Sequence, residues 1–75
     1  MQVDEELDTL GLLCPLPVLK AAKRLRALPA GGTLRLRADD PAAVIDVPHF
    51  CVEQGYELVS SDDADGVQTY VIRKT

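Results

Sequence analysis

Residues 12–20 read Leu-Leu-Cys-Pro-Leu-Pro-Val-Leu-Lys, an apolar segment that leads into a cysteine and two closely spaced prolines. Proline is tolerated in the first turn of a helix, because the N–H that it lacks has no partner there. Pro15 and Pro17 therefore predict that a helix begins just after Cys14. A thiol at the positive end of a helix dipole has a lowered pKa, which favours the thiolate. We interpret Cys14 as a nucleophile, with a buried structural cysteine as the alternative.

The sequence around this stretch alternates between strand and helix patterns. Asp40 is the expected N-cap of a second helix and Pro41 its first residue. Pro48 is expected to interrupt that helix, with Asp46 or Val47 capping the second piece. The expected elements are a strand over 5–10, a helix over 15–28, a strand over 33–38, a helical turn over 41–46, a helix over 48–54, and strands over 56–61 and 67–74.

Apolar side chains recur at helical spacing in both helical segments, which indicates one buried face on each. In the first segment these are Val18, Ala21, Ala22, Leu25 and Leu28. In the second they are Val44, Ile45, Val47, Phe50 and Cys51. Leu34, Leu36 and Ala38 alternate with polar residues, which is typical of a strand with one solvated face, and Asp65-Gly66 predicts a hairpin turn.

This order predicts an α+β fold, a two-layer sandwich in which two helices cover one face of a four-stranded mixed sheet. The 75 residues are enough for a single domain, residues 1–75, with an aliphatic core. The net charge of −4 argues against a general nucleic-acid-binding domain. The chain has no apolar run that could span a membrane, and its acidic start is unlike a signal peptide. We therefore expect a cytoplasmic protein with reduced cysteines.

Other candidate sites have weaker support. Cys51 lies in an apolar stretch and is expected to be buried and inert, although it could serve as a resolving partner for Cys14. Cys14, His49 and Cys51 lack the usual spacing of a zinc site and a fourth ligand. Lys20, Lys23 and Arg24 share the outer face of the first helix, which is either an ordinary solvated face or a basic docking patch.

The motif Leu7-Asp8-x-x-Gly11-Leu12-x-Cys14-Pro15-x-Pro17-Val18 resembles the opening of the TusA/SirA-like sulfur-carrier family. Further along the chain, the matching segments are Leu34, Ala38-Asp39-Asp40-Pro41-Ala42, Asp46-x-Pro48-x-Phe50-Cys51, Gly55-x-Glu57-Leu58 and Tyr70-x-Ile72-Arg73-Lys74. The resemblance covers essentially the whole chain in the correct order.

The resemblance implies that Cys14 carries sulfur as a persulfide, in a turn shaped by Pro15, Leu16 and Pro17. It also implies a monomeric sulfurtransferase-type relay rather than a stand-alone catalyst, with no cofactor besides the persulfide sulfur and no direct contact with nucleic acid or membrane. A cysteine desulfurase or a rhodanese-like protein would be the donor, and a DsrE/TusBCD-like protein the acceptor, as in tRNA thiolation or sulfur oxidation. The partner-docking residues would be Lys20, Lys23, Arg24 and Asp40.

The best-known member of the family has a glutamate between the two motif prolines, where this chain has Leu16. An apolar side chain beside the sulfur favours a different partner surface. Two alternatives to a persulfide carrier remain at this point. One is a non-catalytic interaction or regulatory domain of the same fold, and the other is a thiol redox protein that uses Cys14 and Cys51.

Overall fold

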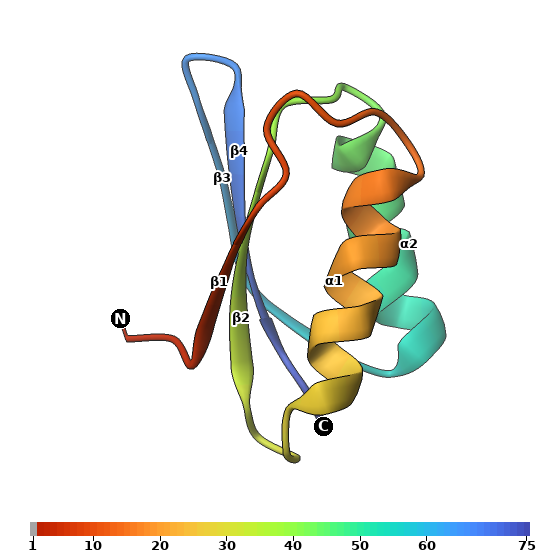
Figure 1. The fold of residues 1–75 in the computed structure, drawn as a ribbon, viewed down its shortest axis with the longest axis vertical. Coiled ribbons are helices and arrows are strands. Elements are labelled where there is room, and N and C mark those ends of the chain that lie inside the picture. The colour runs from red at the N-terminus through yellow and green to blue at the C-terminus, as the bar shows by residue number, and fades with distance from the viewer. Residues whose placement is uncertain (1) are drawn as a thin grey trace.

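The computed structural model describes residues 2–75, and Met1 lies outside them. The elements follow the order β-α-β-α-β-β: β1 (Glu5–Asp8), α1 (Leu16–Ala27), β2 (Thr33–Ala38), α2 (Ala43–Gln54), β3 (Glu57–Ala64) and β4 (Val67–Arg73). The strands form one sheet in the order β1-β2-β4-β3. Both helices lie against the same face of this sheet (Figure 1). The predicted two-layer α+β sandwich is therefore confirmed.

The direction of the strands determines where the functional end of the molecule lies. β1 and β2 pair in parallel, whereas β4 pairs antiparallel with both β2 and β3. A parallel pair needs a crossover connection, which α1 supplies. Because β1 and β2 run the same way, the segments that follow them leave the sheet at the same edge. Figure 1 shows these two connections side by side above the helices.

The core lies between the helices and the inner face of the sheet. Leu34, Leu36 and Ala38 of β2 are fully buried, whereas the alternating Arg35 and Arg37 lie on the outer face. From the helical layer, the buried side chains include Ala21, Leu25, Val47 and Phe50, and β4 adds Tyr70 and Ile72. The alternation predicted for β2 is confirmed. The core is mainly aliphatic, as expected, but it also includes the aromatic rings of Phe50 and Tyr70.

Helix α1 begins close to where the prolines place it. Pro15 precedes its first residue and no side chain caps the helix, while Pro17 lies in its first turn and is buried. Arg24 and Arg26 lie in the last turn, where cations stabilise the negative end of the helix dipole. The buried Ala21 and Leu25 belong to the apolar face expected from the spacing.

Helix α2 differs from the prediction, because it runs unbroken through Pro48. Proline lacks the N–H that would bond to the carbonyl four residues earlier, here that of Val44. Val44 is 52 % exposed, so the residue that loses its helical partner lies at the surface and not in the core. The expected division into two pieces is therefore wrong. Val44 and Ile45 are also exposed rather than directed into the core.

The turns around β3 depend on residues in the left-handed region of φ. Gly55 ends α2 with φ of 75°, and its neighbour Tyr56 donates its N–H to the carbonyl of Cys51, as in a Schellman motif. The hairpin between β3 and β4 has φ of 55° at Asp65 and 79° at Gly66. Positive φ at both central residues is what a type I′ hairpin requires, so the predicted hairpin is confirmed. β3 continues to Ala64, three residues beyond the expected end.

Candidate functional site

Cys14 lies in the connection between β1 and α1, immediately before the helix. Its side chain is exposed, and its peptide bond to Pro15 is cis. The thiol donates a hydrogen bond to Oδ2 of Asp46, at 2.8 Å between sulfur and oxygen. Asp46 belongs to the first turn of α2, so the two helices meet at this contact. Since Cys14 is exposed, the alternative of a buried structural cysteine is excluded.

The backbone on either side of Cys14 is tied to the connection between β2 and α2. The N–H of Cys14 donates to Oδ2 of Asp40, and the N–H of Gly11 donates to Oδ1 of Asp39 at 2.9 Å. The other carboxylate oxygen of Asp40 accepts the N–H of Ala42 at 3.2 Å. The two connections that the parallel strand pair brings together are thus joined by the Asp39-Asp40 side chains.

Asp40 was expected to contact a partner protein, but its side chain is largely buried. It is 9 % exposed, and its two carboxylate oxygens are occupied by backbone N–H groups. It does not cap α2 directly, because that helix begins at Ala43. Asp40 instead fixes the turn that leads into α2 and holds the Cys14 backbone against it, so it positions the thiol rather than offering a surface to a partner.

The pKa of the Cys14 thiol is raised above its ordinary value, which contradicts the expected lowering by the helix dipole. The largest cause is the hydrogen bond to Asp46, which stabilises the protonated thiol. Desolvation and the negative charges of Asp46 and Asp40 act in the same direction. Two carboxylates close to the sulfur thus favour the protonated thiol of Cys14.

Two adjoining hollows open beside Cys14, between α1 and α2. One is a tight space whose lining residues include Pro17, Asp40, Ala43 and Asp46. The other has a volume of about 240 Å³, and Cys14 lines it together with Pro15, Val18, Asp46, His49, Phe50 and Glu53. No lysine or arginine lines either hollow among residues 2–75. The sulfur thus faces an open groove whose charged groups are mainly acidic.

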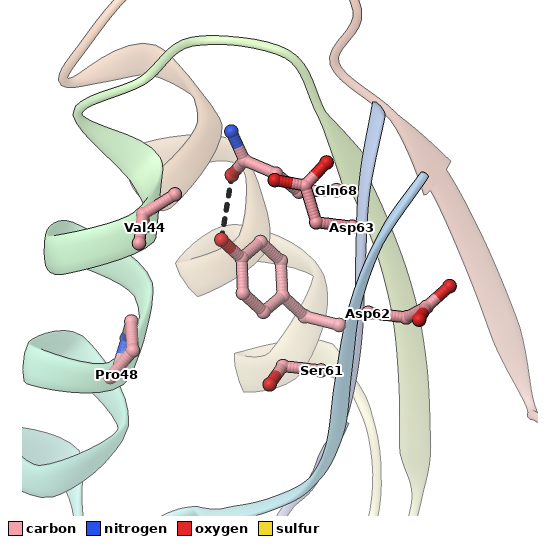
Figure 2. A pocket seen from close by; sticks show the side chains of 7 residues that line it. Val44, Pro48, Ser61, Asp62, Asp63 and Gln68 are labelled. Carbon is pink, nitrogen blue, oxygen red and sulfur yellow. Dashed lines mark hydrogen bonds between the residues drawn. The ribbon is translucent and has the colours of Figure 1, made fainter. Parts of the chain in front are cut away.

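A buried chain of hydrogen bonds leads from the sheet to Asp40. The Tyr70 hydroxyl donates to Oε1 of Gln68 at 2.6 Å, the bond drawn as a dashed line in Figure 2. Nε2 of Gln68 donates to the carbonyl oxygen of Asp40 at 2.9 Å. Gln68 and Tyr70 are 5 % and 4 % exposed. A polar residue on the inner face of β4 therefore supports the residue that holds the Cys14 backbone.

Gln68→Leu is expected to lower the free energy of unfolding by about 1–3 kcal/mol, the cost of leaving buried polar groups unpaired. The substitution removes the donor to the Asp40 carbonyl and the acceptor of the Tyr70 hydroxyl. Tyr70→Phe removes one bond only and should cost about 0.5–1.5 kcal/mol. Urea denaturation of the three proteins measures both values. A Gln68→Leu protein as stable as the wild type would contradict this account.

A separate hollow lies on the other flank of α2, against β3 and β4. It has a volume of about 240 Å³, and its lining includes Val44, Pro48, Ser61 and Gln68. Figure 2 shows Val44 and Pro48 of α2 facing the strands across this space, with Asp62 turned away from the helix. The space contains no cysteine or histidine. Cys14 and its neighbours Asp40 and Asp46 lie on the α1–α2 side.

Of the other residues considered as ligands or redox partners, His49 lines the same hollow as Cys14, whereas Cys51 does not. Cys51 is a free thiol that is 2 % exposed, and burial raises its pKa. His49 is exposed and lies 3.4 Å from Glu53 across one turn of α2. Within residues 2–75, no group of three or more His, Cys, Asp or Glu side chains is placed to hold a metal ion.

The surface around Cys14 is partly apolar and partly basic. Leu13, Leu16 and Leu19 are 69 %, 43 % and 56 % exposed, which is unusual for leucine residues grouped in one stretch. Lys20 and Lys23 are exposed on α1. Arg24 is paired with Glu5 of β1 at 2.8 Å, so it is partly engaged within the chain. The sequence predicted a basic docking patch on α1, and the structure adds exposed leucines, Leu16 among them, to the same surface.

We also compared the chain with known protein families, with individual proteins and with solved structures. The family model described as Sulfurtransferase TusA matches residues 5–74. The chain belongs to the TusA family. The match includes every strand and helix described above, and with them Cys14, Asp40 and Asp46.

Individual TusA relatives match along nearly the whole chain. The sulfur carrier protein TusA of Pseudomonas syringae pv. syringae (strain B728a) is 47 % identical over 74 residues, which are 99 % of this chain and 88 % of the relative. The protein of the same name from Pseudomonas aeruginosa (strain LESB58) is 44 % identical over 72 residues, 96 % of this chain and 91 % of the relative. The crystal structure of a SirA-like protein from Desulfitobacterium hafniense superimposes with a TM-score of 0.83 at 30 % identity, covering 92 % of this chain and 95 % of that one.

Across the part of the chain that the structure describes, neither helix is long and apolar enough to cross a membrane. Asp46 is the site residue that the sequence patterns missed as a functional group, because they assigned it only to capping. Its place in the motif Asp46-x-Pro48-x-Phe50-Cys51 was the available signal. A carboxylate cannot be matched to a thiol 32 residues away without the fold that brings them together.

Proposed function

We propose that this protein is a sulfur carrier that accepts sulfane sulfur on Cys14 as a persulfide and passes it to an acceptor protein. The observation that carries the proposal is that Cys14, just before α1, is an exposed free thiol that forms no disulfide. Family membership adds support, since relatives such as the Pseudomonas syringae protein are sulfur carrier proteins by name. The open groove beside the sulfur suits a thiol that meets a partner's thiol rather than a deeply enclosed substrate.

The transfer is an exchange at sulfur. Cys14 attacks the outer sulfur of a donor persulfide, a new S–S bond forms to Cys14, and the donor's S–S bond breaks. The donor leaves as a thiolate, so the donor cysteine is reduced and Cys14 is oxidised to the same extent. An acceptor thiolate then attacks the outer sulfur and Cys14 leaves. Both steps parallel thiol–disulfide exchange and need no other cofactor.

The chemistry requires a donor and an acceptor that reach the same exposed surface. A cysteine desulfurase or a rhodanese-like protein fits the donor, and a DsrE/TusBCD-like protein fits the acceptor. The relay would serve tRNA 2-thiouridine synthesis or sulfur oxidation, as a monomer in the cytoplasm, where thiols stay reduced. Leu13, Leu16 and Leu19 provide apolar contact beside the sulfur. Lys20 and Lys23 would steer an acidic partner, which raises the association rate more than the affinity.

Intact mass measurement tests the proposal directly. After incubation with a cysteine desulfurase and cysteine, the wild-type protein is expected to gain the mass of one sulfur atom. A reducing agent should remove that mass, since a persulfide is reducible. A protein that gains no sulfur from a desulfurase, a rhodanese or a small persulfide would instead fit a non-catalytic interaction domain.

A further inference from the structure

Cys14 must lose its S–H proton before or while its sulfur attacks a donor. The nucleophile in sulfur exchange is the thiolate, and intrinsic reactivity depends on the fraction deprotonated. Here the thiol is hydrogen-bonded to a carboxylate and lies near a second one, Asp40. The resting protein therefore carries an S–H that must lose its proton during the attack. Some group within reach of the sulfur has to accept it.

The charged and titratable groups that face Cys14 are few. From the β2–α2 connection there is Asp40, and from α2 there are Asp46, His49 and Glu53. Asp40 is bonded to backbone N–H groups through both carboxylate oxygens. His49 and Glu53 pair with each other at 3.4 Å. Of these four groups, Asp46 is the one that accepts a hydrogen bond from the Cys14 sulfur, at 2.8 Å.

We propose that Asp46 is a catalytic residue, the carboxylate that accepts the Cys14 proton as the sulfur attacks a donor persulfide. This inference rests on the proposed sulfur-carrier function. In the loading step, the S–H proton moves to Oδ2 of Asp46 while the Sγ–S bond forms. The donor's S–S bond breaks, and its electron pair leaves with the donor thiolate. Asp46 then gives up the proton to that thiolate or to water, so protons, atoms and electrons balance.

The same carboxyl group serves the unloading step, since a proton acceptor in one direction is a proton donor in the other. When an acceptor thiol attacks the outer sulfur, its proton passes to Asp46, and Cys14 leaves with the electron pair and takes that proton from Asp46. Before loading and again after unloading, Asp46 holds the empty carrier as a protonated thiol. This protects an exposed cysteine from oxidation, which follows thiolate character and exposure.

The Asp46→Asn variant distinguishes a proton acceptor from a group that only sets the thiol pKa. A lower thiol pKa alone should speed the reactions of Cys14, whereas loss of the proton acceptor should slow sulfur loading. Loss of the carboxylate should lower the thiol pKa, so iodoacetamide should alkylate Cys14 about tenfold faster at neutral pH for each pKa unit lost. Sulfur loading from glutathione persulfide should instead slow by about 10²-fold, the lower range of general acid–base contributions. Peptide mapping assigns the alkylation to Cys14. A small donor is chosen because it needs no protein docking.

Two further variants complete the experiment. Asp46→Glu keeps a carboxylate and should restore part of the loading rate, whereas Asp62→Asn removes the same charge from a side chain turned away from α2 and should load like the wild type. Equal or faster loading by Asp46→Asn, alongside faster alkylation, would overturn the proposed role of Asp46. Failure of the wild type to load any sulfur would instead overturn the sulfur-carrier function itself.

Discussion

Cys14→Ser is expected to abolish sulfur loading completely while leaving the fold intact. A hydroxyl oxygen cannot form a persulfide, and no other exposed thiol is available in residues 2–75, because Cys51 is buried. Serine retains the size of cysteine and a donor for Asp46, so the turn around residue 14 should keep its hydrogen bonds. Intact mass after incubation with a cysteine desulfurase and cysteine measures the loss, and circular dichroism checks the fold.

Cys51→Ala is the matched control, since it removes the other thiol without touching the groove. Cys51 is 2 % exposed, so this variant should be somewhat less stable but should gain one sulfur atom as the wild type does. Sulfur uptake by Cys14→Ser equal to that of the wild type would place the site elsewhere. A wild-type protein that loses two hydrogen atoms on mild oxidation would support the alternative of a Cys14–Cys51 redox pair.

The residues with strong local preferences were predictable from the sequence. Pro15 and Pro17 set the start of α1 within one residue, and the alternation of Leu34, Leu36 and Ala38 gave the bounds of β2. Asp65-Gly66 gave the hairpin. Each of these features depends on side-chain and backbone properties within a few residues. The order of elements then limited the fold to a two-layer sandwich with a mixed sheet, whereas the parallel pairing of β1 with β2 came from the structure.

The features that the sequence did not reveal depend on contacts between distant segments. Proline predicts a break wherever it follows four helical residues, yet α2 continues through Pro48 because packing of Val47 and Phe50 holds the helix to the core. Asp40 holds the backbone of Cys14, and the buried Gln68 holds Asp40 in turn. Both contacts depend on the register in which β2 pairs with β4, which the sequence does not show.

The pKa of the Cys14 thiol differs in direction between the sequence-based prediction and the structure. The dipole of α1 is a local property and favours the thiolate. Asp46 and Asp40 come from a different segment, and together they raise the thiol pKa. An exposed but protonated thiol is less prone to oxidation than a thiolate, which suits the proposed carrier function. The site is therefore defined by the α1–α2 contact rather than by the cysteine motif alone.

Leu36→Ala is expected to lower the free energy of unfolding by about 2–5 kcal/mol, the range for removing a buried leucine. Leu36 lies in the middle of β2, fully buried, with Leu7 of β1 and Tyr70 of β4 as its pairing partners. A domain of this size is stable by only about 4–11 kcal/mol, from typical values per residue. The substitution should thus remove a large part of the stability. Urea denaturation followed by circular dichroism measures the change.

Leu13→Ala is the control for this prediction, since the same atoms are removed from a side chain that is 69 % exposed. Its stability should fall by less than about 0.5 kcal/mol, as for ordinary surface substitutions. Equal losses from the two variants would contradict the assignment of Leu36 to the core. The contrast also bears on function, because Leu13 lies beside Cys14. If partners dock on this apolar surface, Leu13→Ala should weaken sulfur transfer from a protein donor while leaving both stability and loading from a small persulfide unchanged.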